Sequence, residues 1–162
     1  MLTDILEYLG VHMTISDATR PKTHEDLSLM GLRGQALEQE IARRDSLYKH
    51  WGFKNPNIWE KLHQWDRFSP KYIFIFRDPV AYNLNGRPAR ITPTERREAR
   101  RAADETLKAL EAATNRTCIL LSYEKILLYP ERTIYALCEY LKIKYKPGVI
   151  EIIKPEKGYH NG

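Results

Sequence analysis

Features that mark specialised protein classes are scarce in this chain. Its only two cysteines, Cys118 and Cys138, stand in apolar surroundings, which favours reduced thiols over a disulfide or a metal pair. The longest apolar run, residues 72–76, is far too short to cross a membrane. The first ten residues lack the basic stretch and apolar stretch of a secretory signal. We therefore expect a cytoplasmic protein without a membrane partner.

The composition is that of one ordinary globular domain. The 162 residues are 43% hydrophobic and 29% charged, without low-complexity tracts, repeats or linkers. The formal net charge is +5, and basic residues cluster at 87–101 and 142–146. Such clusters attract nucleic acid, phosphorylated cofactors or acidic glycans, or they form a solvated helix face balanced by acidic neighbours. No nucleic-acid-binding motif accompanies them, so nucleic acid is not the expected partner.

Hydrophobic patterns predict strands alternating with helices. Apolar residues at helical spacing predict helices at 2–10, 35–48, 58–65, 94–113 and 130–141. Strands are predicted at 50–54, 71–76 and 118–122. Residues 12–33 resemble a polar loop with short helical pieces, and 149–153 a strand or extended segment. Strands that are apolar on both faces and alternate with helices indicate a parallel sheet in an α/β protein.

Two helix ends have specific signals. Gly10 is a plausible stop for the first helix. Thr94 is a good N-cap for the long helix, whose predicted apolar face is formed by Ala99, Ala103, Leu107 and Leu110.

The most informative segment is 71–80, in which an apolar strand ends at Arg77-Asp78-Pro79. The carboxyl ends of parallel strands are where α/β proteins place ligand-binding groups, and proline stops further pairing. A guanidinium at this position is suited to bind a phosphate through two hydrogen bonds. The alternative is a surface arginine that merely follows a buried strand, and this segment alone does not decide between them.

Three segments, in order along the chain, resemble the sulfotransferase family. They read Trp-Gly-Phe-Lys-Asn-Pro at 51–56, Tyr-Ile-Phe-Ile-Phe-Arg-Asp-Pro at 72–79, and Leu-Ser-Tyr-Glu at 121–124, followed by a Pro-Glu helix start. The resemblance extends over nearly the whole chain. It implies transfer of a sulfuryl group from 3′-phosphoadenosine 5′-phosphosulfate (PAPS) to a hydroxyl or amine of a small molecule or glycan. The nucleotide product is adenosine 3′,5′-bisphosphate (PAP), and no metal is required.

The resemblance also implies a fold and a nucleotide site. The fold is a partial three-layer P-loop-NTPase-like fold, with a short parallel sheet flanked by helices in a single domain, 1–162. In this family the Arg-Asp-Pro element holds the 3′-phosphate of PAPS, a role that falls to Arg77. Asn85 replaces the usual serine on the same phosphate, and its amide can also donate. Tyr123 matches a position near the nucleotide, or it packs at the sheet edge. Lys157-Gly158 resembles an element that lies over the nucleotide in cytosolic members of the family.

The implied catalytic residues are Lys54 and Glu25. Lys54 occupies the place where the family keeps a lysine near the sulfuryl group, where it would stabilise charge on the bridging oxygen. The alternative is a surface lysine. Asn55 follows it where cytosolic members have a histidine, so the base is sought elsewhere. Glu25, preferred to His24, lies where carbohydrate and tyrosyl members place a carboxylate. The alternative is that either residue simply caps a helix, since Thr23-x-x-Asp26 is a capping-box variant.

The family's first strand and its phosphate-binding loop, which cradles the 5′-phosphosulfate, have no counterpart in these residues. The segment 1–13 resembles the helix that follows that loop. We therefore expect an N-terminally incomplete domain whose exposed sheet edge promotes self-association. Two functions stay open: a PAPS-dependent sulfotransferase, or a catalytically inactive sulfotransferase-like module that binds a nucleotide or another partner.

The acceptor is not identified by the sequence. Four aromatic residues either line an acceptor cleft or belong to the core: Trp51, Trp59, His63 and Trp65.

Overall fold

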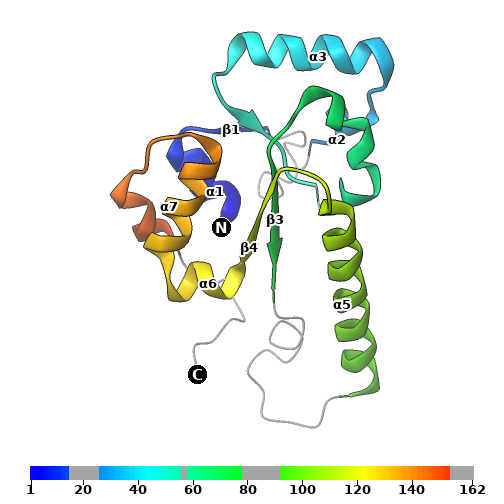
Figure 1. Cartoon of the computed structure of the whole chain (residues 1–162), viewed down its shortest axis with the longest axis vertical. Helices are drawn as coiled ribbons and strands as arrows, with labels where there is room; N and C mark the ends of the chain where they lie inside the picture. Colours follow the sequence, from blue (N-terminus) through cyan, green and yellow to red (C-terminus); the bar gives the residue numbers. More distant parts are fainter. Residues whose placement is uncertain (15–25, 56–57, 78–91, 154–162) are drawn as a thin grey trace. The chain divides into compact units, whose positions relative to one another are not determined.

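The fold is α/β, with two short parallel sheets among helices (Figure 1). The computed structural model describes residues 1–14, 26–55, 58–77 and 92–153. The chain divides into two compact units, Met1–Pro56 and Asn57–Gly162. In each unit the described strands form one parallel pair. The prediction of an α/β protein with parallel strands and flanking helices is therefore confirmed at this level. The single sheet that was predicted is instead two separate strand pairs among the described residues, because the strand at 51–52 pairs with 12–13 rather than with 72–76.

The described part of the first unit contains helices and one strand pair. The elements are α1 (Leu2–Leu9), β1 (His12–Met13), α2 (Leu27–Gly31), α3 (Gly34–Leu47) and β2 (Trp51–Gly52). α1 ends at Gly10 as predicted, with φ 97°, a left-handed conformation that glycine adopts without a steric penalty. β1 was missed in the predicted loop, because a two-residue strand leaves no alternation to detect.

The core of the first unit follows the helical spacing of its apolar residues. Ile5, Leu6 and Leu9 of α1 are buried, and α1 packs against β1. Leu37 and Ile41 lie one turn apart on α3 and are also buried. The helices 2–10 and 35–48 are thus confirmed because each has one apolar face.

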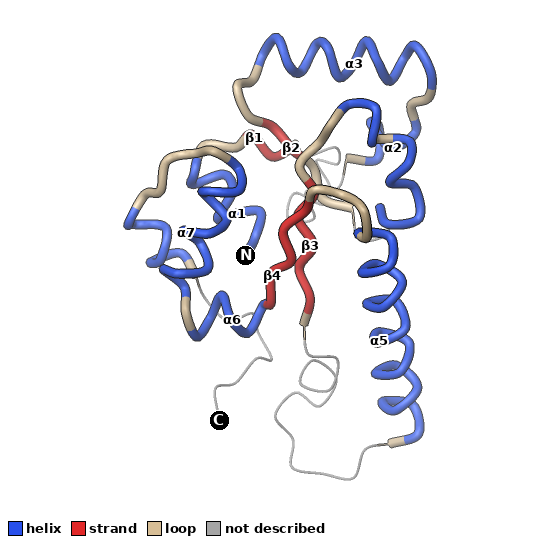
Figure 2. Tube along the Cα trace, viewed as in Figure 1, coloured by secondary structure: helices blue, strands red, loops and turns tan. Residues whose placement is uncertain are grey.

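The second unit contains the longer strand pair. Its described elements are η1 (Ile58–Gln64), η2 (Asp66–Phe68), β3 (Tyr72–Phe76), α5 (Pro93–Ala113), β4 (Cys118–Ser122), α6 (Tyr123–Leu128), α7 (Pro130–Leu141) and η3 (Pro147–Ile152). β3 and β4 are parallel and in register from Tyr72 opposite Cys118 to Phe76 opposite Ser122 (Figure 2). Parallel neighbours need a crossover connection, and α5 lies in it.

Three local predictions in the second unit are corrected. The helix predicted at 58–65 is present as a 3-10 helix over 58–64, but 147–152 also form a 3-10 helix where a strand or extended segment was expected. α5 begins at Pro93, so Thr94 lies inside its first turn. Leu107, predicted on the apolar face of this helix, is 58% exposed, while Ala109 and Ala113 are buried. In a helix rich in alanine, several faces are equally apolar, so the pattern does not select one.

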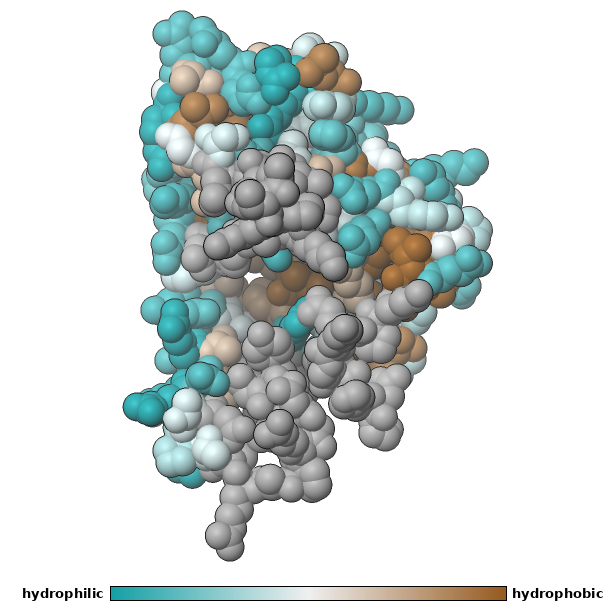
Figure 3. Space-filling view, turned by 180° about the vertical axis from the view of Figure 1, so that it is seen from behind, coloured by the Kyte–Doolittle hydropathy of each residue, from teal (hydrophilic) through white to brown (hydrophobic). Residues whose placement is uncertain are grey.

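The surface and the cysteines agree with the composition. On the face shown in Figure 3, hydrophilic residues predominate and hydrophobic residues gather in separate patches. Within the described residues, no helix combines the length and the hydropathy needed to cross a bilayer. Both cysteines are free, and burial raises the pKa of the Cys138 thiol.

Candidate functional site

The carboxyl ends of β3 and β4 lie side by side because the strands are parallel and in register (Figure 2). Phe76 pairs with Ser122, so the residues that follow them, Arg77 and Tyr123, leave the sheet at the same edge. At this point the chain enters α6, and the Ser122 hydroxyl accepts a hydrogen bond from the backbone N–H of Lys125 (3.2 Å). This N-cap fixes the start of α6, and therefore the position of Tyr123.

Arg77 lies over the aromatic ring of Tyr123. The central guanidinium carbon is 4.1 Å from the ring centroid, within the range of a cation–π contact. Tyr123 is 0% exposed, whereas Arg77 is half-buried. The Tyr123 ring therefore packs against one side of the guanidinium and is not itself accessible to a ligand. Such support restricts the rotamers of Arg77 and reduces the entropy lost when the guanidinium binds an anion.

A second arginine, Arg116, precedes β4 at the opposite end of the strands. Its Nε and Nη2 donate to the two carboxylate oxygens of Asp66 at 2.9 and 2.8 Å. These hydrogen bonds hold the pKa of Asp66 below its usual value. Tyr72 donates to the same carboxylate (2.9 Å), and burial, together with this bond, raises the pKa of Tyr72. The amino end of the sheet is thus stabilised by a structural network, and the carboxyl end is the candidate site.

Lys54 lies in the first unit, two residues after β2, and is exposed. Because β1 and β2 are parallel, it follows the carboxyl end of its own strand pair. At that end the Thr14 hydroxyl donates to the Gly52 carbonyl (3.3 Å). Lys54 and Arg77 therefore each follow the carboxyl end of a parallel pair, in separate units.

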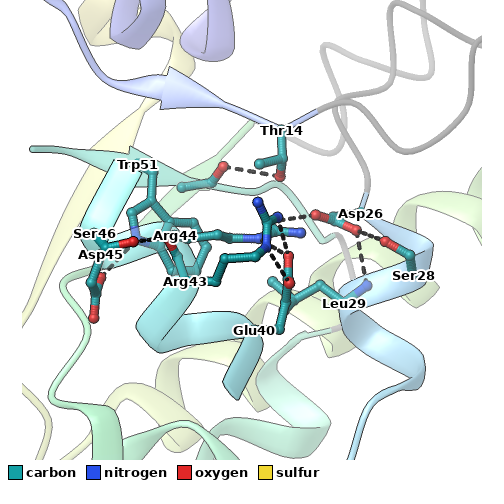
Figure 4. Close-up of polar contacts among 11 residues, drawn as sticks. Thr14, Asp26, Ser28, Leu29, Glu40, Arg43, Arg44, Asp45, Ser46 and Trp51 are labelled. Atoms are coloured by element: carbon teal, nitrogen blue, oxygen red, sulfur yellow. Dashed lines mark hydrogen bonds and ion pairs between the residues drawn. The ribbon is translucent and has the colours of Figure 1, made fainter. Parts of the chain in front are cut away.

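A buried ion-pair cluster in the first unit was not anticipated from the sequence (Figure 4). Nη1 of Arg44 lies 2.6 Å from Oδ2 of Asp26, and the two side chains are 7% and 2% exposed. Nε of Arg44 donates to Glu40 at 2.7 Å, and its guanidinium lies 5.1 Å from the Trp51 ring centroid. The one available signal was the spacing of Glu40 and Arg44, which places them one helical turn apart.

The contacts of the buried Asp26 carboxyl favour its charged form. Burial acts to raise its pKa, but hydrogen bonds from the Leu29 backbone (2.9 Å) and the Ser28 hydroxyl (2.7 Å), together with the ion pair with Arg44, outweigh it, so the pKa is lowered. Asp26 is itself the N-cap of α2, rather than the third residue after a cap at Thr23. Its carboxylate is fully engaged and serves to join α2 to α3.

Five residues considered for the site lie outside the described residues: His24, Glu25, Asn85, Lys157 and Gly158. Of the aromatic residues considered for the acceptor, Trp65 is buried (7% exposed) and belongs to the core. Trp51 and Trp59 are half-buried and His63 is exposed. Among the described residues, no cluster of histidine, cysteine and acidic side chains is arranged to hold a metal.

The fold and this site define an α/β protein with a supported arginine at the carboxyl edge of a parallel strand pair. Searches against family models, curated proteins and solved structures find no match to this chain. The function is therefore inferred from the site itself and from the residues that resemble the sulfotransferase family.

Proposed function

We propose that this chain is a PAPS-dependent sulfotransferase in which Arg77 binds the 3′-phosphate of the nucleotide. The observation that carries the proposal is the placement of Arg77 after β3, with its guanidinium supported by the Tyr123 ring. In this proposal the described strand pairs belong to the partial P-loop-NTPase-like fold that the family resemblance implies.

The chemistry of Arg77 suits a terminal phosphate. A guanidinium can donate two parallel hydrogen bonds to phosphate oxygens, which a lysine cannot do. Hydrogen bonds to charged groups contribute about 1.5–3 kcal/mol each, and the half-buried position of Arg77 lessens competition from water. Arg77 alone would therefore account for a large share of the discrimination between PAP and a nucleotide without the 3′-phosphate.

The proposed reaction transfers one sulfuryl group. The acceptor oxygen or nitrogen attacks sulfur, the bond between sulfur and the 5′-phosphate oxygen breaks, and PAP leaves with the additional negative charge. Lys54 would stabilise that charge, and Glu25 would take the acceptor proton. Asn85, Lys157 and Gly158 would complete the nucleotide site. The acceptor is a small molecule or carbohydrate in the cytoplasm.

A second candidate is a catalytically inactive module that retains nucleotide binding. It is favoured by one sequence observation: no Gly-x-x-x-x-Gly-Lys-Ser/Thr loop occurs in these 162 residues to hold the 5′-phosphosulfate. The two candidates share the Arg77 site and differ in turnover.

Titration calorimetry with two ligands tests the Arg77 assignment. PAP carries the 3′-phosphate, whereas adenosine 5′-monophosphate lacks it. Arg77→Ala should weaken PAP binding by about tenfold to a hundredfold, which corresponds to the loss of one charged hydrogen-bonding group. Binding of the monophosphate should not change. Lys71→Ala is the matched control, because Lys71 is an exposed cation that precedes the same strand at its other end.

The outcomes separate the possibilities. Unchanged PAP affinity in Arg77→Ala, or an equal loss for both ligands, would remove the 3′-phosphate role. Release of PAP from PAPS in the presence of acceptor alcohols, phenols and amines supports the enzyme, and PAP binding without release supports the inactive module.

A further inference from the structure

The outer face of α7 carries exposed residues that neither the core nor the candidate site uses. Tyr135, in the middle of the helix, is 56% exposed. Leu128, the last residue of α6, and Tyr129, the N-cap of α7, are 70% and 62% exposed. Another face of α7 is buried through Ile134, Leu137 and Cys138. Exposed large apolar side chains are typical of protein interfaces, in which tyrosine is enriched.

Charged residues flank Tyr135 on the same face. With 3.6 residues per turn, four residues fall within about 100° of the helix circumference, namely Glu131, Arg132, Tyr135 and Glu139, and Lys142 follows as the C-cap of α7. All five side chains are exposed. None of the four charged ones forms an ion pair within the described part of the chain. A glutamate and an arginine thus begin this face, and a glutamate and a lysine end it.

We propose that this face of α7 is the interface of a symmetric homodimer, in which two copies of the helix pack antiparallel about a twofold axis near Tyr135. An isologous interface must be complementary to itself, so that the contact of residue i with residue j occurs twice. The order of charges on α7 meets this condition.

The antiparallel arrangement follows from the spacing. Arg132 and Glu139 lie at equal distances, about 5 Å along the helix axis, on either side of the midpoint between residues 135 and 136. A twofold axis through that midpoint places Arg132 opposite Glu139 of the partner subunit. The same operation brings Glu131 near Lys142 of the partner subunit. A parallel pair would instead place Arg132 and Glu139 each against its own copy, and like charges repel.

The aromatic centre of this face is held in position before association. The rings of Tyr135 and Tyr145 lie 6.2 Å apart at an interplanar angle of 57°, a favourable tilted arrangement. Because Tyr145 restricts the Tyr135 ring, less side-chain entropy is lost when a partner covers it. One helix face is small, below the roughly 1,200 Å² that marks weak complexes, so the dimer is a reversible one. The proposed interface is a helix face, and it is distinct from the self-association at a sheet edge that the sequence predicts.

Sedimentation velocity of the full chain over a concentration series tests the proposal. The samples are the wild type, Arg132→Glu, Glu139→Arg and an equimolar mixture of these two variants. Lys108→Glu is the control, because Lys108 is exposed on α5 and its substitution changes the net charge as much as Arg132→Glu does. Circular dichroism verifies that each exposed-site variant is folded.

The wild type and the control should dimerise with the same dissociation constant. Each charge-reversal variant should weaken the dimer by at least about tenfold, since the twofold axis turns two attractive contacts into repulsive ones. The mixture should recover dimers, because both charge pairs are complementary again when one copy of each variant associates. A monomeric wild type, variants that dimerise like the wild type, or a mixture that stays monomeric would each overturn the proposal.

Discussion

At the scale of single residues, an arginine lies at each end of the β3–β4 pair, and the two arginines make different contacts. The guanidinium of Arg116 is engaged by the Asp66 carboxylate, and this pair closes the amino end. The guanidinium of Arg77 lies against the Tyr123 ring, whose quadrupole attracts a cation. This contact orients the guanidinium at the carboxyl end, where the proposed nucleotide site lies.

The support from Tyr123 leads to a prediction on nucleotide affinity. Tyr123→Phe keeps the aromatic face, so PAP affinity should stay within about twofold. Tyr123→Leu keeps an apolar side chain but removes the face, and affinity should fall by about fivefold to thirtyfold, the equivalent of 1–2 kcal/mol. Titration calorimetry at a temperature at which both variants are folded measures the difference. Equal affinities in the two variants would show that Tyr123 serves packing alone.

At the scale of elements, the sequence predicted the helices and strands whose apolar residues follow a regular pattern. It missed the element that is too short to show such a pattern. The spacing of Ile134, Leu137 and Cys138 predicted α7, and Gly10 predicted the end of α1. The strand 71–76 was evident from its run of aromatic and branched residues. β1 was not predicted because it has only two residues, and Leu107 was wrongly placed on the apolar face of α5 because alanine does not distinguish core from surface.

The same contrast applies to the candidate site. Arg77 was found because a proline follows a strand, a local signal. The contact of Arg77 with Tyr123 joins residues far apart in sequence. The sequence pattern therefore placed Tyr123 near the nucleotide but did not predict that its ring contacts the Arg77 guanidinium. The pair of Asp26 and Arg44 was missed for the same reason, since it joins two elements whose relative placement is set by packing.

This buried pair leads to a prediction on stability. Asp26→Ala removes both a buried charge partner and the cap of α2, and should lower the free energy of unfolding by about 3–5 kcal/mol. Asp26→Asn keeps a capping side chain and should be less destabilising by about 1 kcal/mol. Asp104→Ala, an exposed acidic site on α5, is the control and should change stability by less than about 0.5 kcal/mol. Urea denaturation at neutral pH measures all three.

The same cluster fixes a direction for the pH dependence. Hydrogen bonds from Arg43 and Arg44 lower the pKa of Glu40 from 4.5 to about 2, and the pKa of Asp26 is also lowered. A carboxyl whose pKa is lower in the folded state stabilises the fold above its unfolded value, and this contribution is lost as the pH falls. The wild type should therefore lose stability between about pH 4.5 and 2. The difference in the free energy of unfolding between the wild type and Asp26→Asn should become smaller as the pH falls. A difference that does not depend on pH would contradict the lowered pKa of Asp26.

At the scale of the whole molecule, the proposed reaction assigns two roles to two parts of the chain. Arg77 and Tyr123 belong to the second unit, and Lys54 belongs to the first. The proposal assigns binding of the 3′-phosphate to Arg77 and stabilisation of the departing charge to Lys54. Affinity and turnover should therefore respond to different substitutions.

Substitution of Lys54 tests this division. Lys54→Ala should reduce the rate of PAP release from PAPS by about a hundredfold or more, as expected when a group that stabilises transition-state charge is removed. The affinity for PAP should change by less than about threefold, since PAP lacks the sulfuryl group. Lys49→Ala, another exposed lysine of the first unit, is the control. Equal turnover in Lys54→Ala and the wild type would remove the catalytic role.

The parallel register of β3 and β4 also bears on how the chain acquires its structure during synthesis. Tyr72 meets Cys118 only after the whole of α5 has been made, so β3 leaves the ribosome without its neighbour. Contacts between residues so distant in sequence are slow to form. The apolar strand 72–76 is thus exposed for much of translation, and slower elongation through residues 93–113 would prolong the interval in which chaperones must shield it.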